Sequence, residues 1–77
     1  EERLLLGSGA AALLESLSPR ERQIAGLVCR GHSTKTIASS LLLTPATVYR
    51  HVSNIFEKAE VHSRGELVAR VYGTQER

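Results

Sequence analysis

Apolar residues recur at helical spacing in four separate segments of this chain. In the first segment Ile24, Leu27 and Val28 occupy positions i, i+3 and i+4, and in the last segment Leu67 and Val71 lie four residues apart. No run shows the strict alternation of apolar and polar residues that is typical of a half-buried strand. The pattern predicts an all-α fold, a compact four-helix bundle with helices at about 19–30, 34–41, 45–59 and 64–72.

Start and stop signals support these four helices. A residue type that caps helix N-termini precedes each of them: Ser18, Ser33, Thr44 and Ser63. Pro19 and Pro45 suit the first helical position, and Glu21 and Glu66 each stand three residues after a serine cap, as in a capping box. Gly31 is expected to end the first helix in a left-handed conformation, and Gly73 to end the last. Each predicted helix therefore has its own boundary signals.

The second and third helices are joined by only about three residues, 42–44. A short helix, a tight turn and a longer helix form the pattern of a helix-turn-helix, whose second helix enters the major groove of DNA. In the short helix Ile37, Ala38 and Leu41 form the predicted buried face, and Leu42 is a further candidate for it.

The residue pattern of the third helix predicts two faces of different chemistry. At about 100° per residue its apolar residues form one stripe that should face the core, namely Val48, Val52, Ile55 and Ala59, with Phe56 at the edge. The opposite side and its flanks carry Ala46, Tyr49, Arg50, Ser53 and Asn54. No acid occurs on this side before Glu57, whereas an ordinary solvated face mixes Glu and Lys. This composition favours contact with a polar or anionic partner.

Charge and length add little to the prediction of fold and partner. The chain has 77 residues and a net charge of +2, and between Ser18 and Arg70 eight basic residues stand against four acidic ones. A basic central segment permits an anionic partner without requiring one. The single cysteine, Cys29, cannot form an internal disulfide, which suits a reducing, intracellular setting. The sequence contains neither an apolar run of membrane-spanning length nor a signal-peptide pattern.

The start of the chain reads differently from the rest. Gly7 and Gly9 interrupt any long helix there, and the absence of methionine from the chain indicates a piece of a longer protein. Three parts are predicted: residues 1–16 as a linker or the tail of an upstream domain, residues 17–73 as the domain, and residues 74–77 as a C-terminal tail. Three leucines near the first boundary are expected to pack against the domain: Leu13, Leu14 and Leu17.

The sequence predicts no enzyme, cofactor or metal site. His32, His51 and His62 are too scattered for a metal-ligand pattern, and Cys29 has no partner at ligand spacing. A set of nucleophile, base and orienting group is not visible, nor is a glycine-rich phosphate loop.

Five pieces of the sequence occur together in one order: "LSPRE", "GHSTKTIA", "TPATVYRH", "IFEK" and "VHSRGEL". Across residues 17–71 this order and spacing closely resemble the LuxR-type helix-turn-helix domain of bacterial transcription regulators, also called the NarL or GerE type. The resemblance implies a four-helix domain whose second and third helices form the helix-turn-helix. It also implies sequence-specific binding of double-stranded DNA, with helix 45–59 as the recognition helix.

The resemblance implies roles for individual residues. Base contacts are expected at Tyr49, Arg50, Ser53 and Asn54. Phosphate contacts are expected at Ser33, Thr34, Lys35, Thr44, Thr47, His51 and Lys58. A homodimer on DNA would form through the fourth helix, with Leu67, Val68, Val71 and Tyr72 as contacts. Hydroxyls, backbone N–H groups at helix N-termini and lysines are physically suited to phosphate.

This chain departs from the family pattern in ways that bear on these roles. The family often has an acid at the position of Thr36, and commonly Leu-Gly at the positions of Ala59 and Glu60. It often has Lys and Val where Tyr49 and Arg50 stand, so base preference does not transfer from relatives.

The expected protein is the effector module of a regulator in the bacterial cytoplasm, associated with the nucleoid. An upstream sensor would control it, and RNA polymerase is a further candidate partner. Two alternatives stay open: a promoter reader like region four of sigma factors, and a helical protein-interaction module that has lost DNA binding. The piece "VHSRGEL" argues against the first, and a steep salt dependence of binding would argue against the second.

Overall fold

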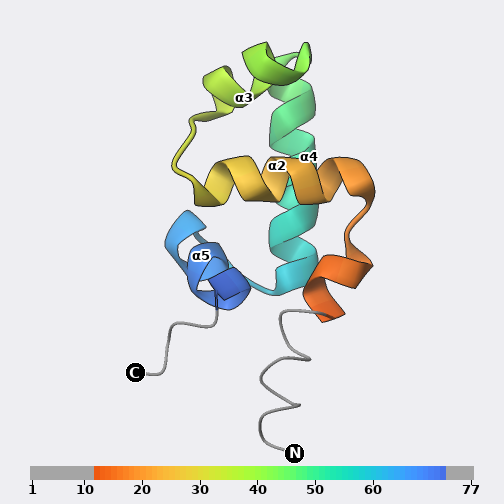
Figure 1. Cartoon of the computed structure of the whole chain (residues 1–77), viewed down its shortest axis with the longest axis vertical. Coiled ribbons are helices and arrows are strands. Elements are labelled where there is room, and N and C mark those ends of the chain that lie inside the picture. The colour runs from red at the N-terminus through yellow and green to blue at the C-terminus, as the bar shows by residue number, and fades with distance from the viewer. Residues whose placement is uncertain (1–11, 73–77) are drawn as a thin grey trace, which may run out of the picture.

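The computed structural model describes residues 12–72, and every regular element among them is an α-helix (Figure 1). The four main helices among these residues are α2 (Pro19–Cys29), α3 (Thr34–Leu41), α4 (Pro45–Ala59) and α5 (Arg64–Tyr72). The all-α prediction is confirmed, and three helices have the predicted bounds. Helix α2 ends at Cys29, one residue earlier than predicted, because Arg30 is its C-cap. Residues 12–16 add a short helical segment where a linker was expected.

Helix α4 is the longest element, and the other helices pack around it. Helix α2 crosses α4, α3 lies beside the N-terminal end of α4, and α5 lies near its C-terminal end (Figure 1). The predicted stripe of α4 faces inward, since Val48, Ile55 and Ala59 are fully buried and Val52 is half-buried. This packing leaves the opposite side of α4 uncovered.

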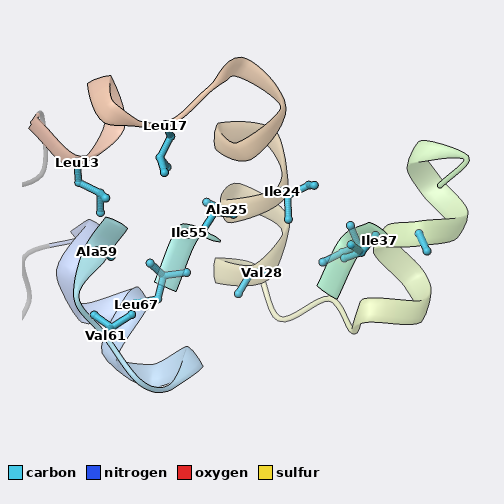
Figure 2. Packing of buried hydrophobic residues seen from close by; sticks show 12 residues of the cluster. Leu13, Leu17, Ile24, Ala25, Val28, Ile37, Ile55, Ala59, Val61 and Leu67 are labelled. Atoms are coloured by element: carbon cyan, nitrogen blue, oxygen red, sulfur yellow. The ribbon is translucent and has the colours of Figure 1, made fainter. Parts of the chain in front are cut away.

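The core joins all of these elements (Figure 2). Its buried apolar residues are Leu13, Leu17, Ile24, Ala25, Val28, Ile37, Ala38, Val48, Ile55, Ala59, Val61 and Leu67. Each large aliphatic side chain among them stabilises the fold by about 1.5–3 kcal/mol relative to exposure. The predicted inward positions of α2 and α3 are therefore confirmed for Ile24, Val28, Ile37 and Ala38.

Two of the three N-terminal leucines pack as expected. Leu13 and Leu17 are buried in the core, next to residues of α4 and α5 in Figure 2. Leu14 is 38% exposed, so its predicted packing is wrong. Leu17 directly follows the helical segment 12–16, and its N–H donates to the carbonyl of Leu14 at 3.3 Å, so it keeps roughly the position of an i+4 residue and turns inward with Leu13.

The helix starts follow the predicted capping chemistry. The Oγ of Ser18 accepts the N–H of Glu21 at 3.1 Å, and a carboxylate oxygen of Glu21 accepts the N–H of Ser18 at 2.9 Å, which completes the capping box. Ser33 and Thr44 each accept one backbone N–H through their hydroxyl oxygens. Leu43, just before Thr44, is half-buried against the core that contains Val48, which is the arrangement of a hydrophobic staple.

The predicted capping box of the last helix forms only in half. The Oγ of Ser63 accepts the N–H of Glu66 at 3.1 Å, but the Glu66 carboxylate accepts the N–H of His62 at 2.7 Å rather than that of Ser63. The turn before α5 places the donor of His62 closer to this carboxylate. Glu66 therefore forms its hydrogen bond to the backbone one residue earlier in the turn than predicted.

Within residues 12–72, three helices end with a residue in the left-handed region, and Gly73, predicted to end the last helix, lies outside the described residues. Gly31 has φ 93°, as predicted, and the N–H groups of His32 and Gly31 donate back to the carbonyls of Leu27 and Val28. Leu42 and Glu60 adopt φ 59° at the ends of α3 and α4 and support the same pair of returning hydrogen bonds.

The predicted burial of Leu42 is wrong. Its side chain is 92% exposed, because the left-handed turn directs it away from the core.

Arg64 ties the start of α5 to the end of α2. Its Nη1 donates to the carbonyl of Val28 at 3.1 Å and to that of His32 at 2.8 Å. Carbonyls at the end of a helix lack partners within the helix, and a cation complements the negative end of the dipole. The arginine of the "VHSRGEL" piece thus has a structural role that the sequence did not indicate.

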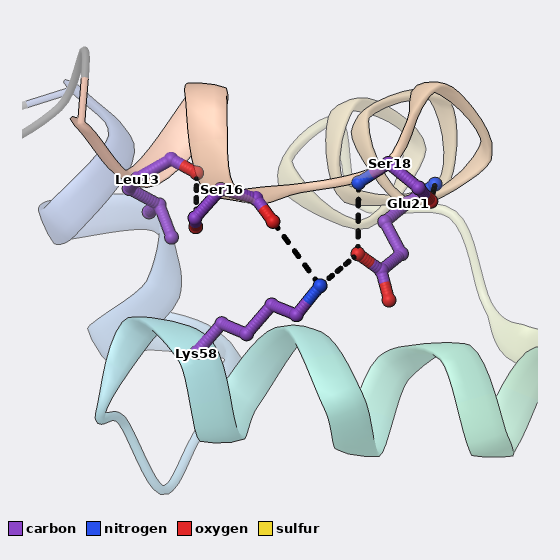
Figure 3. Close-up of polar contacts among 5 residues, drawn as sticks. All are labelled: Leu13, Ser16, Ser18, Glu21 and Lys58. Atoms are coloured by element: carbon purple, nitrogen blue, oxygen red, sulfur yellow. Dashed lines mark hydrogen bonds and ion pairs between the residues drawn. The ribbon is translucent and has the colours of Figure 1, made fainter.

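A second long-range link joins three elements on one flank of α4 (Figure 3). The Nζ of Lys58 donates to a carboxylate oxygen of Glu21 at 2.8 Å and to the carbonyl of Ser16 at 3.1 Å. Glu21 is buried, whereas the Lys58 side chain is 42% exposed. The Lys58 ammonium and, secondarily, the N–H of Ser18 lower the pKa of Glu21 from its ordinary 4.5. These bonds outweigh the burial of the carboxyl, which acts in the opposite direction.

Replacing Glu21 with Gln should lower the free energy of unfolding at neutral pH by about 1.5–3 kcal/mol, the range for hydrogen bonds to a charged group. The pKa of Glu21 is lowered in the fold, so its contribution is complete above the unfolded pKa and is lost as the pH falls through the folded pKa. The gap between wild type and Glu21→Gln should therefore close in urea titrations taken from about pH 7 to about pH 3. Glu57→Gln, at an exposed position of α4, is the matched control; a gap that stays constant with pH would contradict the role of the charge.

Replacing Glu60 with Gly should stabilise the domain. A left-handed conformation costs a non-glycine residue about 1–2 kcal/mol, and glycine removes most of this strain. Thermal unfolding should show a rise in Tm of about 4–8 °C for each 1 kcal/mol gained. The same substitution three residues earlier, Glu57→Gly inside α4, should destabilise by about 1 kcal/mol. A lower Tm for Glu60→Gly would show that the turn is not strained.

Candidate nucleic-acid interface

The outer face of α4 carries the four residues predicted to contact bases. Tyr49 is 63% exposed, and Arg50, Ser53 and Asn54 are also exposed. They lie within two turns of one another, on the side of α4 that faces away from its buried stripe. The structure therefore brings these four side chains together on one open surface.

Their polar groups are available to a partner. Within residues 12–72 no side-chain hydrogen bond engages Arg50 or Asn54, the two residues of this face with the most donors. The guanidinium of Arg50 can donate two parallel bonds to guanine, and the amide of Asn54 matches the donor and acceptor of adenine. The first turn of α4 contains no acid, and Glu57 follows only towards the C-terminal half.

The N-terminal ends of α3 and α4 carry most of the residues predicted to contact phosphates. Ser33, Lys35 and Thr44 are exposed, while Thr34 and Thr47 are half-buried. The hydroxyl oxygens of Thr44 and Thr47 lie 2.9 Å apart, so the two side chains form one polar group at the start of α4. Neither helix has an acid in its first turn. Both ends therefore keep the positive potential of a helix N-terminus.

Lys58 and His51 lie on the flank of α4 near Glu21. The ammonium of Lys58 is already held by Glu21 and by the carbonyl of Ser16 (Figure 3). His51 is half-buried, and its charge would further lower the pKa of Glu21. The ammonium that was predicted to contact a phosphate therefore already has hydrogen-bond partners within the domain. Sequence reasoning treated Glu21 only as a cap, because residues 37 positions apart give no local signal that they meet.

Helix α5 presents part of the face predicted for a dimer. Leu67 is fully buried in the core of its own domain. Val68 and Val71 are half-buried, and Tyr72 is 59% exposed. Of the four residues predicted as dimer contacts, Val68, Val71 and Tyr72 therefore keep some exposed surface.

The remaining candidate groups have ordinary surroundings. Cys29 is half-buried, and burial raises the pKa of its thiol. Among residues 12–72 no three histidine, cysteine or carboxylate side chains cluster as metal ligands would. None of the helices in that part of the chain has the length and apolar character needed to cross a membrane.

Comparison with known proteins agrees with this geometry. The family described as "Bacterial regulatory proteins, luxR family" matches residues 15–71. The monoamine regulon transcriptional regulator of Klebsiella aerogenes is 46% identical over 56 residues, which are 73% of this chain and 25% of that protein. The response regulator protein VraR of Staphylococcus aureus is 45% identical over 58 residues, 75% of this chain and 28% of that protein. VraR of Staphylococcus epidermidis matches over the same shares.

The chain thus spans about a quarter of the length of these relatives. No solved structure matched the chain. The family match covers α2 to α5 and includes both the open face of α4 and the capped starts of α3 and α4. The chain belongs to the LuxR family of bacterial regulatory proteins, and residues 15–71 are its DNA-binding helix-turn-helix domain.

Proposed function

We propose that this domain reads a specific double-stranded DNA sequence by placing α4 in the major groove. The observation that carries the proposal is the division of α4 into a fully buried stripe and an open polar face. A recognition helix needs both, because the stripe fixes its orientation and the open face reaches base edges. The side chains assigned to base contacts are Tyr49, Arg50, Ser53 and Asn54.

Chemistry assigns each of these side chains a partner. Arg50, on the middle of the open face, suits guanine O6 and N7, and Asn54 suits adenine. Tyr49 can pack on a thymine methyl group or reach a phosphate, and Ser53 can bond to either kind of partner.

Phosphate contacts on either side of the groove would fix the register of the helix. The proposed groups are the hydroxyls of Ser33, Thr34, Thr44 and Thr47, the ammonium groups of Lys35 and Lys58, and the imidazole of His51. Two helix N-termini without acids support this placement. For Lys58, contact with a phosphate requires that its ammonium share or leave the carboxylate of Glu21.

A homodimer would extend the reading to two half-sites. Val68, Val71 and Tyr72 offer an apolar contact on α5, and a two-fold dimer would bind an inverted repeat with half-sites about 34–36 Å apart. Leu67 would support this contact from within the core.

The chain would act as the effector module of a longer, cytoplasmic and nucleoid-associated regulator. Its relatives are described as a transcriptional regulator and as response regulators, and they extend well beyond the matched part. A sensor elsewhere in the protein would control the access of α4 to DNA, and RNA polymerase is a second candidate partner. The family is a class of DNA-binding regulators rather than of enzymes, and no catalytic role is proposed.

Arg50→Ala should reduce affinity for the preferred DNA site by about 1–3 kcal/mol and relax the preference at one base pair, because a bidentate contact with guanine is lost. The preferred site is first selected from a random duplex library, and binding is then measured by fluorescence anisotropy on that site and on scrambled duplexes. Arg22→Ala, on the outer face of α2, is the matched control and should change neither affinity. Equal losses on both kinds of duplex would exclude base reading by Arg50.

Lys35→Ala should weaken binding to every duplex by a similar factor and reduce the slope of log K against log salt by about 1. The physical reason is that one phosphate contact fewer releases one counterion fewer. Lys58→Ala, measured beside it, reports whether the ammonium held by Glu21 also reaches DNA. A slope that does not change removes the substituted lysine from the phosphate set.

A further inference from the structure

A groove between α2 and α3 is not used by the proposed DNA contacts. Its lining residues are Gln23, Gly26, Leu27 and Arg30 from α2 and Ser40 and Leu41 from α3. Leu27 and Leu41 are half-buried and form its apolar floor, whereas the other lining residues are exposed. A Cβ atom built on Gly26 would meet nothing within 4 Å, so the groove has room for a side chain from outside.

The groove is electropositive. Arg30 is one of its lining residues, and Arg20, which precedes the lining residue Gln23 by three positions on α2, donates through its Nη1 to the Oε1 of Gln23 at 3.0 Å, which holds the guanidinium beside the groove. The only acid of α2, Glu21, is buried and paired with Lys58. Helix α3 contains no acid. The exposed surfaces of both helices therefore carry positive charge without a carboxylate of their own.

This surface lies away from the recognition face. Helix α2 crosses α4 (Figure 1) and packs on its buried stripe, whereas the open face lies on the opposite side of α4. A duplex bound along the open face would lie on the side of α4 opposite to α2, and the groove is lined by residues at the C-terminal end of α3 rather than by the proposed phosphate contacts at its N-terminal end. The positive charge of the groove is therefore not explained by contact with the same DNA.

We propose that the groove docks a protein segment that carries carboxylates on both sides of one apolar side chain. The apolar side chain would sit over Gly26, between Leu27 and Leu41, and the carboxylates would pair with Arg20 and Arg30. Charge complementarity selects an acidic partner, and the apolar floor favours a protein segment, whose apolar side chain can fill the space over Gly26. The inference does not depend on which bases α4 reads.

The test uses two short synthetic peptides, one with glutamates flanking a single leucine and one with glutamines in their place. They are titrated into the ¹⁵N-labelled chain and followed in ¹H–¹⁵N spectra. The acidic peptide should shift the amides of 23–30 and 40–41, and leave those of 46–54 in place. The glutamine peptide should bind several-fold more weakly. Arg20→Gln and Arg30→Gln should each reduce affinity for the acidic peptide by about two- to five-fold, as expected for exposed ion pairs.

A matched pair of glycine substitutions separates docking from stability. Gly26→Gln fills the groove and improves the helix propensity of α2, so it should abolish binding without unfolding the domain. Gly65→Gln, at a position of α5 that is equally open, should leave binding unchanged. A bound operator duplex should leave the affinity for the peptide unchanged within about two-fold, because the two faces do not overlap.

Three outcomes would overturn the proposal. The first is equal binding of the two peptides, and the second is a set of shifts centred on 46–54 or on α5. The third is a DNA duplex that shifts 23–30 and competes with the peptide, which would assign the groove to nucleic acid. Loss of sequence-specific DNA binding in Arg50 variants would not affect any of these readouts.

Discussion

The buried stripe of α4 is the constraint on which the rest of this domain depends. Val48, Ile55 and Ala59 exclude water completely, and α2, α3 and α5 gather around the same helix. A helix that buries one side must turn the other side outward, so the open face of α4 is set by packing before any ligand arrives. A helix face held by a core in this way loses little conformational freedom when it binds a partner.

Two polar links hold the ends of this arrangement. Lys58 joins Glu21 and Ser16 on one flank of α4, while Arg64 satisfies carbonyls at the end of α2. Such links matter in a small domain, because a thin core leaves only a narrow margin of stability. Through Lys58 the N-terminal segment 12–17, the capping box of α2 and helix α4 form one connected unit. A substitution in segment 12–17 that breaks this link would therefore also alter the surroundings of Lys58 on α4.

The turns show how tertiary packing overrides local preference. Gly31, Leu42 and Glu60 occupy equivalent left-handed positions, although only the first is the residue type that favours them. The returning hydrogen bonds and the packing of Leu43 and Val61 hold the other two in place. At Leu42 the same geometry exposes a large apolar side chain beside the start of α4.

Local patterns were sufficient for much of this structure. Helix bounds, caps, the inward stripe of α4 and the exposure of Tyr49 and Arg50 all follow from interactions between residues a few positions apart, which spacing and residue type record directly. Other features could not be predicted from local patterns, because they depend on segments that come together only when the chain folds. The pairing of Lys58 with Glu21, the full burial of Leu67, the outward turn of Leu42 and the groove between α2 and α3 arise from contacts between distant parts of the chain or from backbone geometry that packing imposes. The order of residues along the chain does not say which distant segments come into contact, because those contacts form only when the helices pack together.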